Sequence, residues 1–139
     1  MQRGIRSGIA PLNEHPLKSK GGPRRLLNAL RYSWQGLRAA FRHEAAFRQE
    51  LAIALPLLLL TPWVAQGALH ALLLVGVWVA VWVVELLNSA IEALADQQSL
   101  DKVPLLGRAK DLGSAAVLLT LGFALLVWAL ALWTWWRGG

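Results

Sequence analysis

The sequence predicts an all-α membrane protein, with an N-terminal amphipathic surface helix followed by three transmembrane helices. The chain has 139 residues, of which 56% are hydrophobic, and this length is typical of a single domain. Ten of its 14 Lys and Arg residues lie at or before Arg48, whereas apolar runs fill most of the remainder. Uncharged runs of about 20 residues indicate membrane-spanning helices, because a helix satisfies its own backbone hydrogen bonds in lipid.

The residue totals also restrict the possible functions. The chain contains no cysteine, which excludes disulfides, thiolate metal sites and thiol catalysis. Its 14 basic against 8 acidic residues would suggest nucleic-acid binding in a soluble protein. In so apolar a chain, a membrane surface with anionic lipids is the better partner. We therefore expect a lipid bilayer as partner and no nucleic acid.

The first part of the membrane domain, residues 24–43, is predicted to be a basic amphipathic helix. Residues 1–23 before it mix Gly and Pro with scattered charges, which predicts a flexible tail. One face of the helix is apolar and carries Leu26, Leu30, Trp34, Leu37 and Phe41, and the neighbouring flank is basic. Such a helix lies in the membrane interface with its apolar face down. Packing on a soluble partner, or on the rest of this protein, is the alternative.

Three apolar segments are predicted to cross the membrane, at about residues 45–65, 68–96 and 112–136. The uncharged core of the first, residues 51–65, would be about 22 Å long as a helix, which is short of the hydrocarbon thickness of about 30 Å. Its flanking residues must therefore lie within the interface. A polar connector, residues 97–110, precedes the third segment, and Asp111 can cap the helix that follows.

The basic residues predict the orientation of these spans. With three spans, the N-terminal region and the connector with Lys102, Arg108 and Lys110 lie on one side. The turn between the first two spans contains no Lys or Arg. By the positive-inside rule, the N-terminus and the connector are cytoplasmic and the C-terminus lies on the far side.

One face of the second span carries polar side chains whose burial in a membrane is energetically unfavourable. Glu85, Asn88, Glu92 and Asp96 are spaced three, four and four residues apart, so they share one face of a helix. A carboxylate in the bilayer costs on the order of 2.5–3.5 kcal/mol before any pairing. The alternative is an ordinary solvated helix end just beyond the membrane, which fits Asp96 alone better than it fits Glu85 and Glu92 together.

The polar residues at the cytoplasmic side suit phosphoryl chemistry. Carboxylates that meet at a membrane surface suit Mg²⁺, which takes one or two of them together with substrate phosphates. Arginines and Lys110 nearby supply positive charge for polyanionic phosphates. Glu85, which lies deepest in the apolar run, suits a general base acting on a lipid hydroxyl. The chain has neither the Gly-rich loop ending in Gly-Lys-Ser/Thr nor the dinucleotide Gly-x-Gly-x-x-Gly motif.

Four blocks in this order closely resemble the bacterial integral-membrane diacylglycerol kinases. They read SWQGLRAA at 33–40, EAAFRQE at 44–50, ELLNSAIEA at 85–93 and GRAKDLGSAA at 107–116. The resemblance extends from Arg24 to the C-terminus. It implies a homotrimer in the bacterial inner membrane, with active sites shared between subunits. The implied reaction transfers the γ-phosphoryl group of MgATP to diacylglycerol and gives phosphatidate.

The resemblance also implies roles for individual residues. Glu85 is similar to the family's general base, and Glu44 and Glu92 to its Mg²⁺ ligands. The implied nucleotide contacts are Arg25, Tyr32, Glu44, Glu92, Asp101, Lys102, Val103, Lys110 and Asp111. The implied lipid-substrate contacts are Ser33, Trp34, Arg38, Ala46, Phe47, Arg48, Gln49, Glu50, Glu85, Asn88 and Ser114. The connector at 96–104 departs from the pattern of the family, which leaves the role of residues 101–103 open.

Two alternatives remain at this point. An undecaprenol kinase of the same fold would use the same chemistry on another lipid, although the block at 44–50 looks more like the diacylglycerol branch. In a non-enzymatic scaffold or small transporter subunit, Glu85 and Glu92 would instead pair within a helix bundle. Lys110 and Asp111 favour an enzyme, because a scaffold has no reason to place this pair on the same side as the carboxylates.

Overall fold

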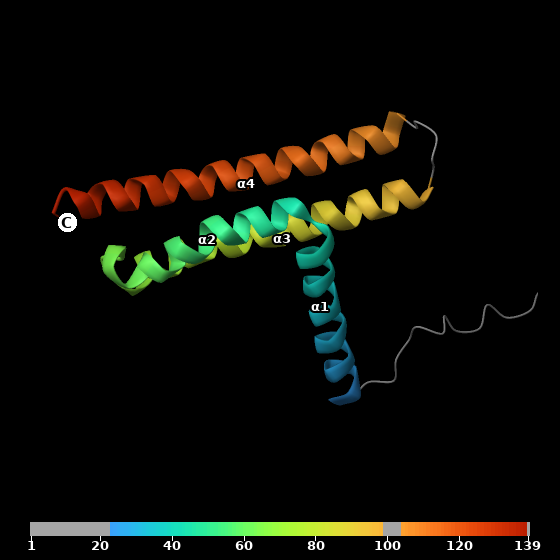
Figure 1. Cartoon of the computed structure of the whole chain (residues 1–139), viewed down its shortest axis with the longest axis horizontal. Coiled ribbons are helices and arrows are strands. Elements are labelled where there is room, and N and C mark those ends of the chain that lie inside the picture. Colours follow the sequence, from blue (N-terminus) through green and yellow to red (C-terminus); the bar gives the residue numbers. More distant parts are fainter. Residues whose placement is uncertain (1–22, 99–103, 139) are drawn as a thin grey trace, which may run out of the picture. The chain divides into compact units, whose positions relative to one another are not determined.

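The computed structural model describes residues 23–98 and 104–138, and within them the chain is helical with no strand. Its helices are α1 (Pro23–His43), α2 (Ala45–Val64), α3 (Ala68–Gln98) and α4 (Pro104–Trp136) (Figure 1). The last three are long and apolar enough to cross a membrane. The predictions of an all-α fold and of three candidate spans are therefore confirmed. The predicted flexible tail lies outside the described residues except for Pro23, which begins α1.

The third apolar helix begins earlier than the sequence predicted. α4 starts at Pro104, so Asp111 lies inside the helix and the prediction that it caps this span is wrong. Proline is favoured at the first helical position, because its missing N–H has no partner there in any case. Most of the residues that follow are good helix formers, and the single Gly107 does not stop the helix.

Two compact units divide the chain, with their boundary between Gln35 and Gly36 inside α1. In the first unit, every described residue, from Pro23 to Gln35, is exposed. α1 is thus helical as predicted, and its amphipathic role at a membrane surface stays a prediction. The second unit contains the end of α1 together with α2, α3 and α4.

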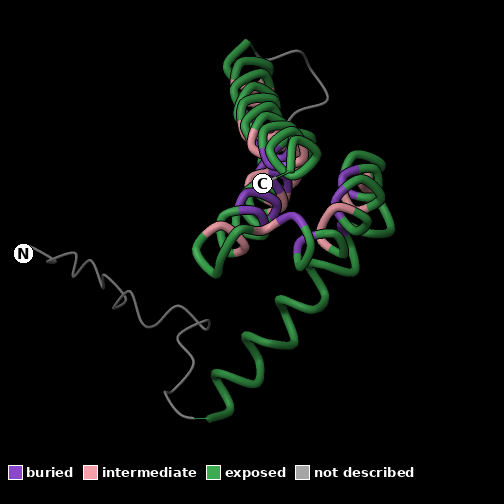
Figure 2. Tube along the Cα trace, turned by 90° about the vertical axis from the view of Figure 1, so that its left-hand side faces the viewer, coloured by how far each residue is buried: buried purple, intermediate pink, exposed green. Residues whose placement is uncertain are grey.

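Within the second unit, α3 is the central helix. It runs antiparallel to α4 along most of its length, and α2 lies against its first half (Figure 1). Buried residues line the sides of α2, α3 and α4 that face one another, whereas most other positions are exposed (Figure 2). This exposure of apolar side chains is the pattern expected of helices that face lipid or other subunits.

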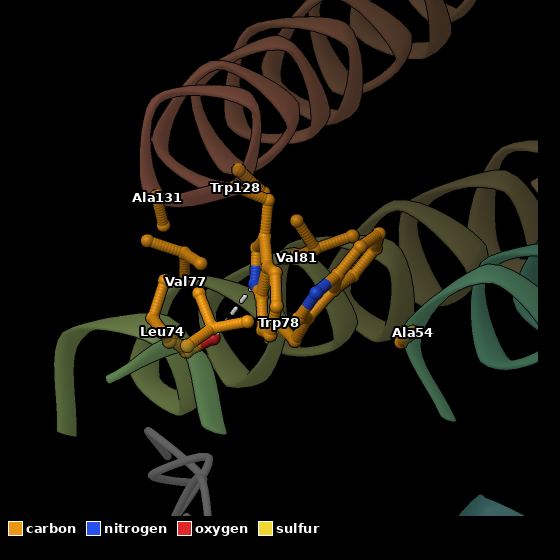
Figure 3. Packing of buried hydrophobic residues seen from close by; sticks show 9 residues of the cluster. Ala54, Leu74, Val77, Trp78, Val81, Trp128 and Ala131 are labelled. Atoms are coloured by element: carbon orange, nitrogen blue, oxygen red, sulfur yellow. Dashed lines mark hydrogen bonds between the residues drawn. The ribbon is translucent and has the colours of Figure 1, made fainter. Parts of the chain in front are cut away.

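The apolar core joins all three long helices, and Figure 3 shows its main side chains. Trp78 and Leu74 of α3 are fully buried, and Trp128 of α4 is 1% exposed. The indole Nε1–H of Trp128 donates a hydrogen bond of 3.1 Å to the Leu74 carbonyl oxygen, so one side chain bridges the two helices. The small residues Ala54 and Ala124 are fully buried in the same cluster as the tryptophans, and small side chains let helices approach closely.

A tight connection links α2 to α3. Gly67 has φ of 155°, a backbone conformation that residues with side chains rarely adopt. The backbone N–H of Gln66 donates a hydrogen bond of 3.2 Å to the His70 Nδ1 atom, which holds the connection against the first turn of α3. This arrangement returns the chain so that α3 can pack beside α2.

Candidate functional site

The polar face of α3 runs from the core toward the exposed end of the helix. Glu85 is only 3% exposed and Asn88 is 9% exposed, whereas Glu92 is half-buried and Asp96 is exposed. The four residues share the face that the sequence predicted, but their surroundings change along it. Glu85 is therefore the acid that is most isolated from solvent, and Glu92 can reach a polar ligand near the surface.

Asn88 is hydrogen-bonded to Glu92 on this face. Its Nδ2 atom donates a hydrogen bond of 3.2 Å to the Oε1 atom of Glu92, one helical turn further along. This bond restrains the Glu92 carboxylate and leaves its second oxygen available. The Oδ1 atom of Asn88 is buried and has no hydrogen-bond partner among the described residues.

Two further acids come from α2 and the residue before it. The Glu85 carboxylate lies close enough to Glu44 and Glu92 for electrostatic repulsion between like charges. Glu50 is repelled by Glu85 in the same way. Glu50 is 4% exposed, and its Oε2 atom has no described partner. The fold thus brings four predicted site residues, Glu44, Glu50, Glu85 and Glu92, into one electrostatic neighbourhood.

These acids fit the chemistry of a nucleotide-bound Mg²⁺ ion. In the parts of the chain that the structure describes, no three acidic or His side chains are grouped closely enough to hold a metal by themselves. Mg²⁺ needs only one or two carboxylates when substrate phosphates supply further oxygens. Glu44 and Glu92 are both half-buried, so their oxygens are partly accessible from outside the helices.

Lys110 pairs with an acid that the sequence did not single out as its partner. Its Nζ atom lies 2.9 Å from the Oδ1 atom of Asp96, which ties α4 to the end of α3. Both side chains remain partly exposed, at 38% for Lys110 and 71% for Asp96. Lys110 also interacts electrostatically with Glu92, so a positive charge borders the acids. Asp111 is exposed on the same helix.

Arg48 has a structural partner that sequence reasoning missed. Its Nη1 atom donates hydrogen bonds of 3.2 Å to the carbonyl oxygens of Phe41 and Arg42, at the end of α1. The last carbonyls of a helix have no partners within the helix, so this side chain caps α1. Glu44, the single non-helical residue between α1 and α2, lies at the same corner. The capping role and the lipid contact implied for Arg48 do not exclude each other.

The remaining predicted residues differ in their surroundings. Phe47 is 5% exposed and packs inward, while Ala46, Gln49 and Ser114 are exposed. The predicted contacts Arg25, Tyr32, Ser33 and Trp34 are exposed and lie in the first unit, and the predicted contact Arg38 is exposed in the second. The predicted nucleotide contacts Asp101, Lys102 and Val103 lie outside the described residues.

A groove away from the acids is mostly apolar. It has a volume of about 1300 Å³, and it lies between the first half of α3 and the middle of α4. Leu72, Gly76 and Phe123 are among its lining residues, which include no carboxylate. The candidate site is therefore not inside this groove but in the second half of α3.

Comparison with known proteins gives a consistent family. Residues 31–132 match the family model described as prokaryotic diacylglycerol kinase. The diacylglycerol kinase of Escherichia coli is 44% identical over 110 residues, which cover 79% of this chain and 90% of that protein. The diacylglycerol kinase of Pseudomonas aeruginosa is 41% identical over 118 residues, covering 85% of this chain and 96% of the relative. That of Haemophilus influenzae is 40% identical over 103 residues, covering 74% and 87%.

Proposed function

The chain belongs to the prokaryotic diacylglycerol kinase family, and we propose that it transfers the γ-phosphoryl group of MgATP to 1,2-diacylglycerol, giving phosphatidate. The observation that carries this proposal is the buried Glu85 on the polar face of an otherwise apolar helix, with Asn88 and Glu92 beside it. A buried carboxylate is expensive in a membrane, which makes a functional role for Glu85 the favoured explanation.

Glu85 is the proposed general base. The hydroxyl oxygen of the lipid attacks the γ-phosphorus, while its proton passes to the Glu85 carboxylate. The bond between the γ-phosphorus and the bridging oxygen breaks, and ADP leaves with the electron pair. Transfer of a loose phosphoryl group depends mainly on positioning and on neutralisation of charge, which a small protein can provide. Burial of Glu85 in an apolar helix suits a reaction with a lipid hydroxyl, because that hydroxyl lies at the membrane boundary.

Glu44 and Glu92 are the proposed ligands of Mg²⁺. When bound with the nucleotide, this ion would offset the negative charge of the phosphates. Asn88 holds the Glu92 carboxylate through its hydrogen bond. When the nucleotide binds, the Lys110 ammonium group would leave Asp96 and contact a phosphate oxygen of the nucleotide. This exchange costs little free energy because an exposed ion pair is weak. The other nucleotide contacts that we propose are Arg25, Tyr32, Asp111 and residues 101–103.

The proposed setting is the cytoplasmic face of a bacterial inner membrane. We propose a homotrimer, with the N-terminus in the cytoplasm and the C-terminus on the far side. The large share of apolar side chains exposed on α2, α3 and α4 is consistent with contact with lipid and with other subunits. The lipid substrate would lie near residues 46–50, Ser33, Trp34, Arg38, Asn88 and Ser114.

Phosphate transfer from labelled ATP in mixed micelles tests this proposal. Purified protein would be given diacylglycerol and undecaprenol in parallel, with the Glu85→Gln variant as the blank. We expect label in phosphatidate and none above background in the blank. Label mainly in undecaprenyl phosphate would contradict the proposed substrate. Equal label from the Glu85→Gln variant would contradict the proposed base.

A further inference from the structure

Gly113 of α4 lies against Asn88 on the polar face of α3. It is buried, and a Cβ atom added at this position would overlap the Oδ1 atom of Asn88 and lie 3.2 Å from its Cγ atom. The same Cβ would lie 3.8 Å from the Asn88 Cα atom, so the backbone of α3 itself leaves ordinary space. A methyl group at Gly113 therefore conflicts with the Asn88 side chain and not with the packing of the two helices.

Other helical glycines of the chain do not share this restriction. A Cβ added at Gly76, Gly107 or Gly122 would meet nothing within 4 Å. Gly122 lies on the same helix as Gly113 and is exposed. The requirement for glycine on α4 is thus specific to the position opposite Asn88, and Gly122 provides a matched control.

The Asn88 amide is held from two sides. Its Nδ2 atom donates to Glu92, and its Oδ1 atom is enclosed against Gly113 without a hydrogen-bond partner among the described residues. Rotation of the amide to escape a new methyl group would remove the Nδ2 atom from Glu92. The close approach of α4 at Gly113 thereby limits the space in which the amide can move, and the hydrogen bond to Glu92 sets its orientation.

We propose that Gly113 is a positioning residue for the Glu92 carboxylate. Because it has no side chain, Asn88 can occupy the interface between α3 and α4 in the orientation that hydrogen-bonds Glu92. The consequence for metal binding rests on the proposed role of Glu92 as a ligand. Groups that orient a metal ligand typically alter metal affinity or activity by about 10–100-fold when they are removed.

The test compares Gly113→Ala with Gly122→Ala, Asn88→Ala, Glu92→Gln and the double variant Gly113→Ala/Asn88→Ala. The primary measurement is the Mg²⁺ concentration at half-maximal kinase activity, with kcat and the KM for diacylglycerol taken separately. Binding of Mn²⁺ in the presence of a non-hydrolysable ATP analogue, followed by electron paramagnetic resonance, gives a readout independent of turnover. Unfolding by SDS in mixed micelles reports stability.

We expect Gly113→Ala and Asn88→Ala each to raise the half-saturating Mg²⁺ concentration by about tenfold, with weaker Mn²⁺ binding. The double variant should resemble Asn88→Ala, because residues that act through one contact are not additive. It also removes the steric conflict, so it keeps the test decisive if Gly113→Ala alone folds poorly. Gly122→Ala should match the unmodified protein.

Three results would overturn the inference. In the first, Gly113→Ala has the same half-saturating Mg²⁺ concentration as Gly122→Ala, while Glu92→Gln raises this concentration. That result would exclude Gly113 as a positioning residue for Glu92 and leave the proposed function intact. In the second, the fold-changes in half-saturating Mg²⁺ concentration caused by Gly113→Ala and by Asn88→Ala multiply in the double variant. That result would show that the two residues act independently. In the third, Glu92→Gln has normal metal dependence, which would contradict the proposed role of Glu92 as a Mg²⁺ ligand. This outcome is a failure of the proposed function, and the Glu92→Gln variant by itself identifies it.

Discussion

The same two helices, α3 and α4, build two different environments at their two ends. At one end, Trp78, Leu74 and Trp128 fill the contact with large apolar side chains, and the Trp128 indole is bonded to the opposite backbone. At the other end, Asn88 meets a glycine, and buried Glu85 faces other acids. Both ends are closely packed, but among the described residues of α3 and α4 the buried acid, Glu85, lies at the second end.

From this difference we assign stability to the tryptophan end and the proposed chemistry to the Glu85 end. Buried apolar side chains gain dispersion contacts with their neighbours, so the tryptophan end favours association of the helices. Buried carboxylates oppose folding unless they are paired, so the Glu85 end must be held in place by the rest of the molecule. Variants at the two ends should therefore separate stability from turnover.

The largest expected effect comes from Glu85→Gln at the polar end. Loss of a general base typically lowers turnover by about 10²–10⁴-fold, while the amide keeps the size of the side chain. Resistance to SDS unfolding should stay the same or increase, because a buried charge has been removed. Turnover and unfolding measured on one preparation would check both parts. A large loss of stability with normal turnover of the folded fraction would contradict the assignment.

An intermediate effect is expected from Trp128→Phe at the apolar end. This change removes the hydrogen bond to the Leu74 carbonyl and leaves a small cavity, and it should destabilise the protein by about 1–3 kcal/mol. Turnover per folded molecule should remain normal. The matched control is Trp136→Phe, since Trp136 is 76% exposed. If Trp128→Phe lowered turnover and left unfolding unchanged, the division between the two ends would be wrong.

The smallest effect on stability is expected at the ion pair that closes the polar end. Asp96→Asn and Lys110→Gln each break the exposed contact between these residues, so both should cause the same slight destabilisation, which decreases at high salt. Only Lys110→Gln should also raise the KM for MgATP, because only this variant removes a proposed phosphate contact. Equal KM values for the two variants would count against that contact.

The sequence was a good guide to elements and to one face of one helix. Apolar runs predicted the three candidate spans, and the three- and four-residue spacing placed Glu85, Asn88 and Glu92 together on α3. The start of α4 was misplaced, because a polar and glycine-containing stretch is typical of a connector as well as of an exposed helix end. The sequence did not identify Gly113 as a candidate site residue. A glycine within a helical segment is the only feature that could have indicated it, and the sequence does not show that Asn88 of another helix lies against it.

What the sequence determined by itself is therefore the local part of this protein: which segments form helices, which of them are apolar enough for a membrane, and which polar side chains share a helical face. These properties depend on residues within a few positions of each other. The tertiary structure decided the pairs that cross between elements, namely Lys110 with Asp96, Trp128 with Leu74 and Gly113 with Asn88. The physical reason is that helices as apolar as α3 and α4 offer hydrophobic side chains on nearly every face. Many rotations and registers would then bury similar area, and only the fitted contacts of the folded chain select one.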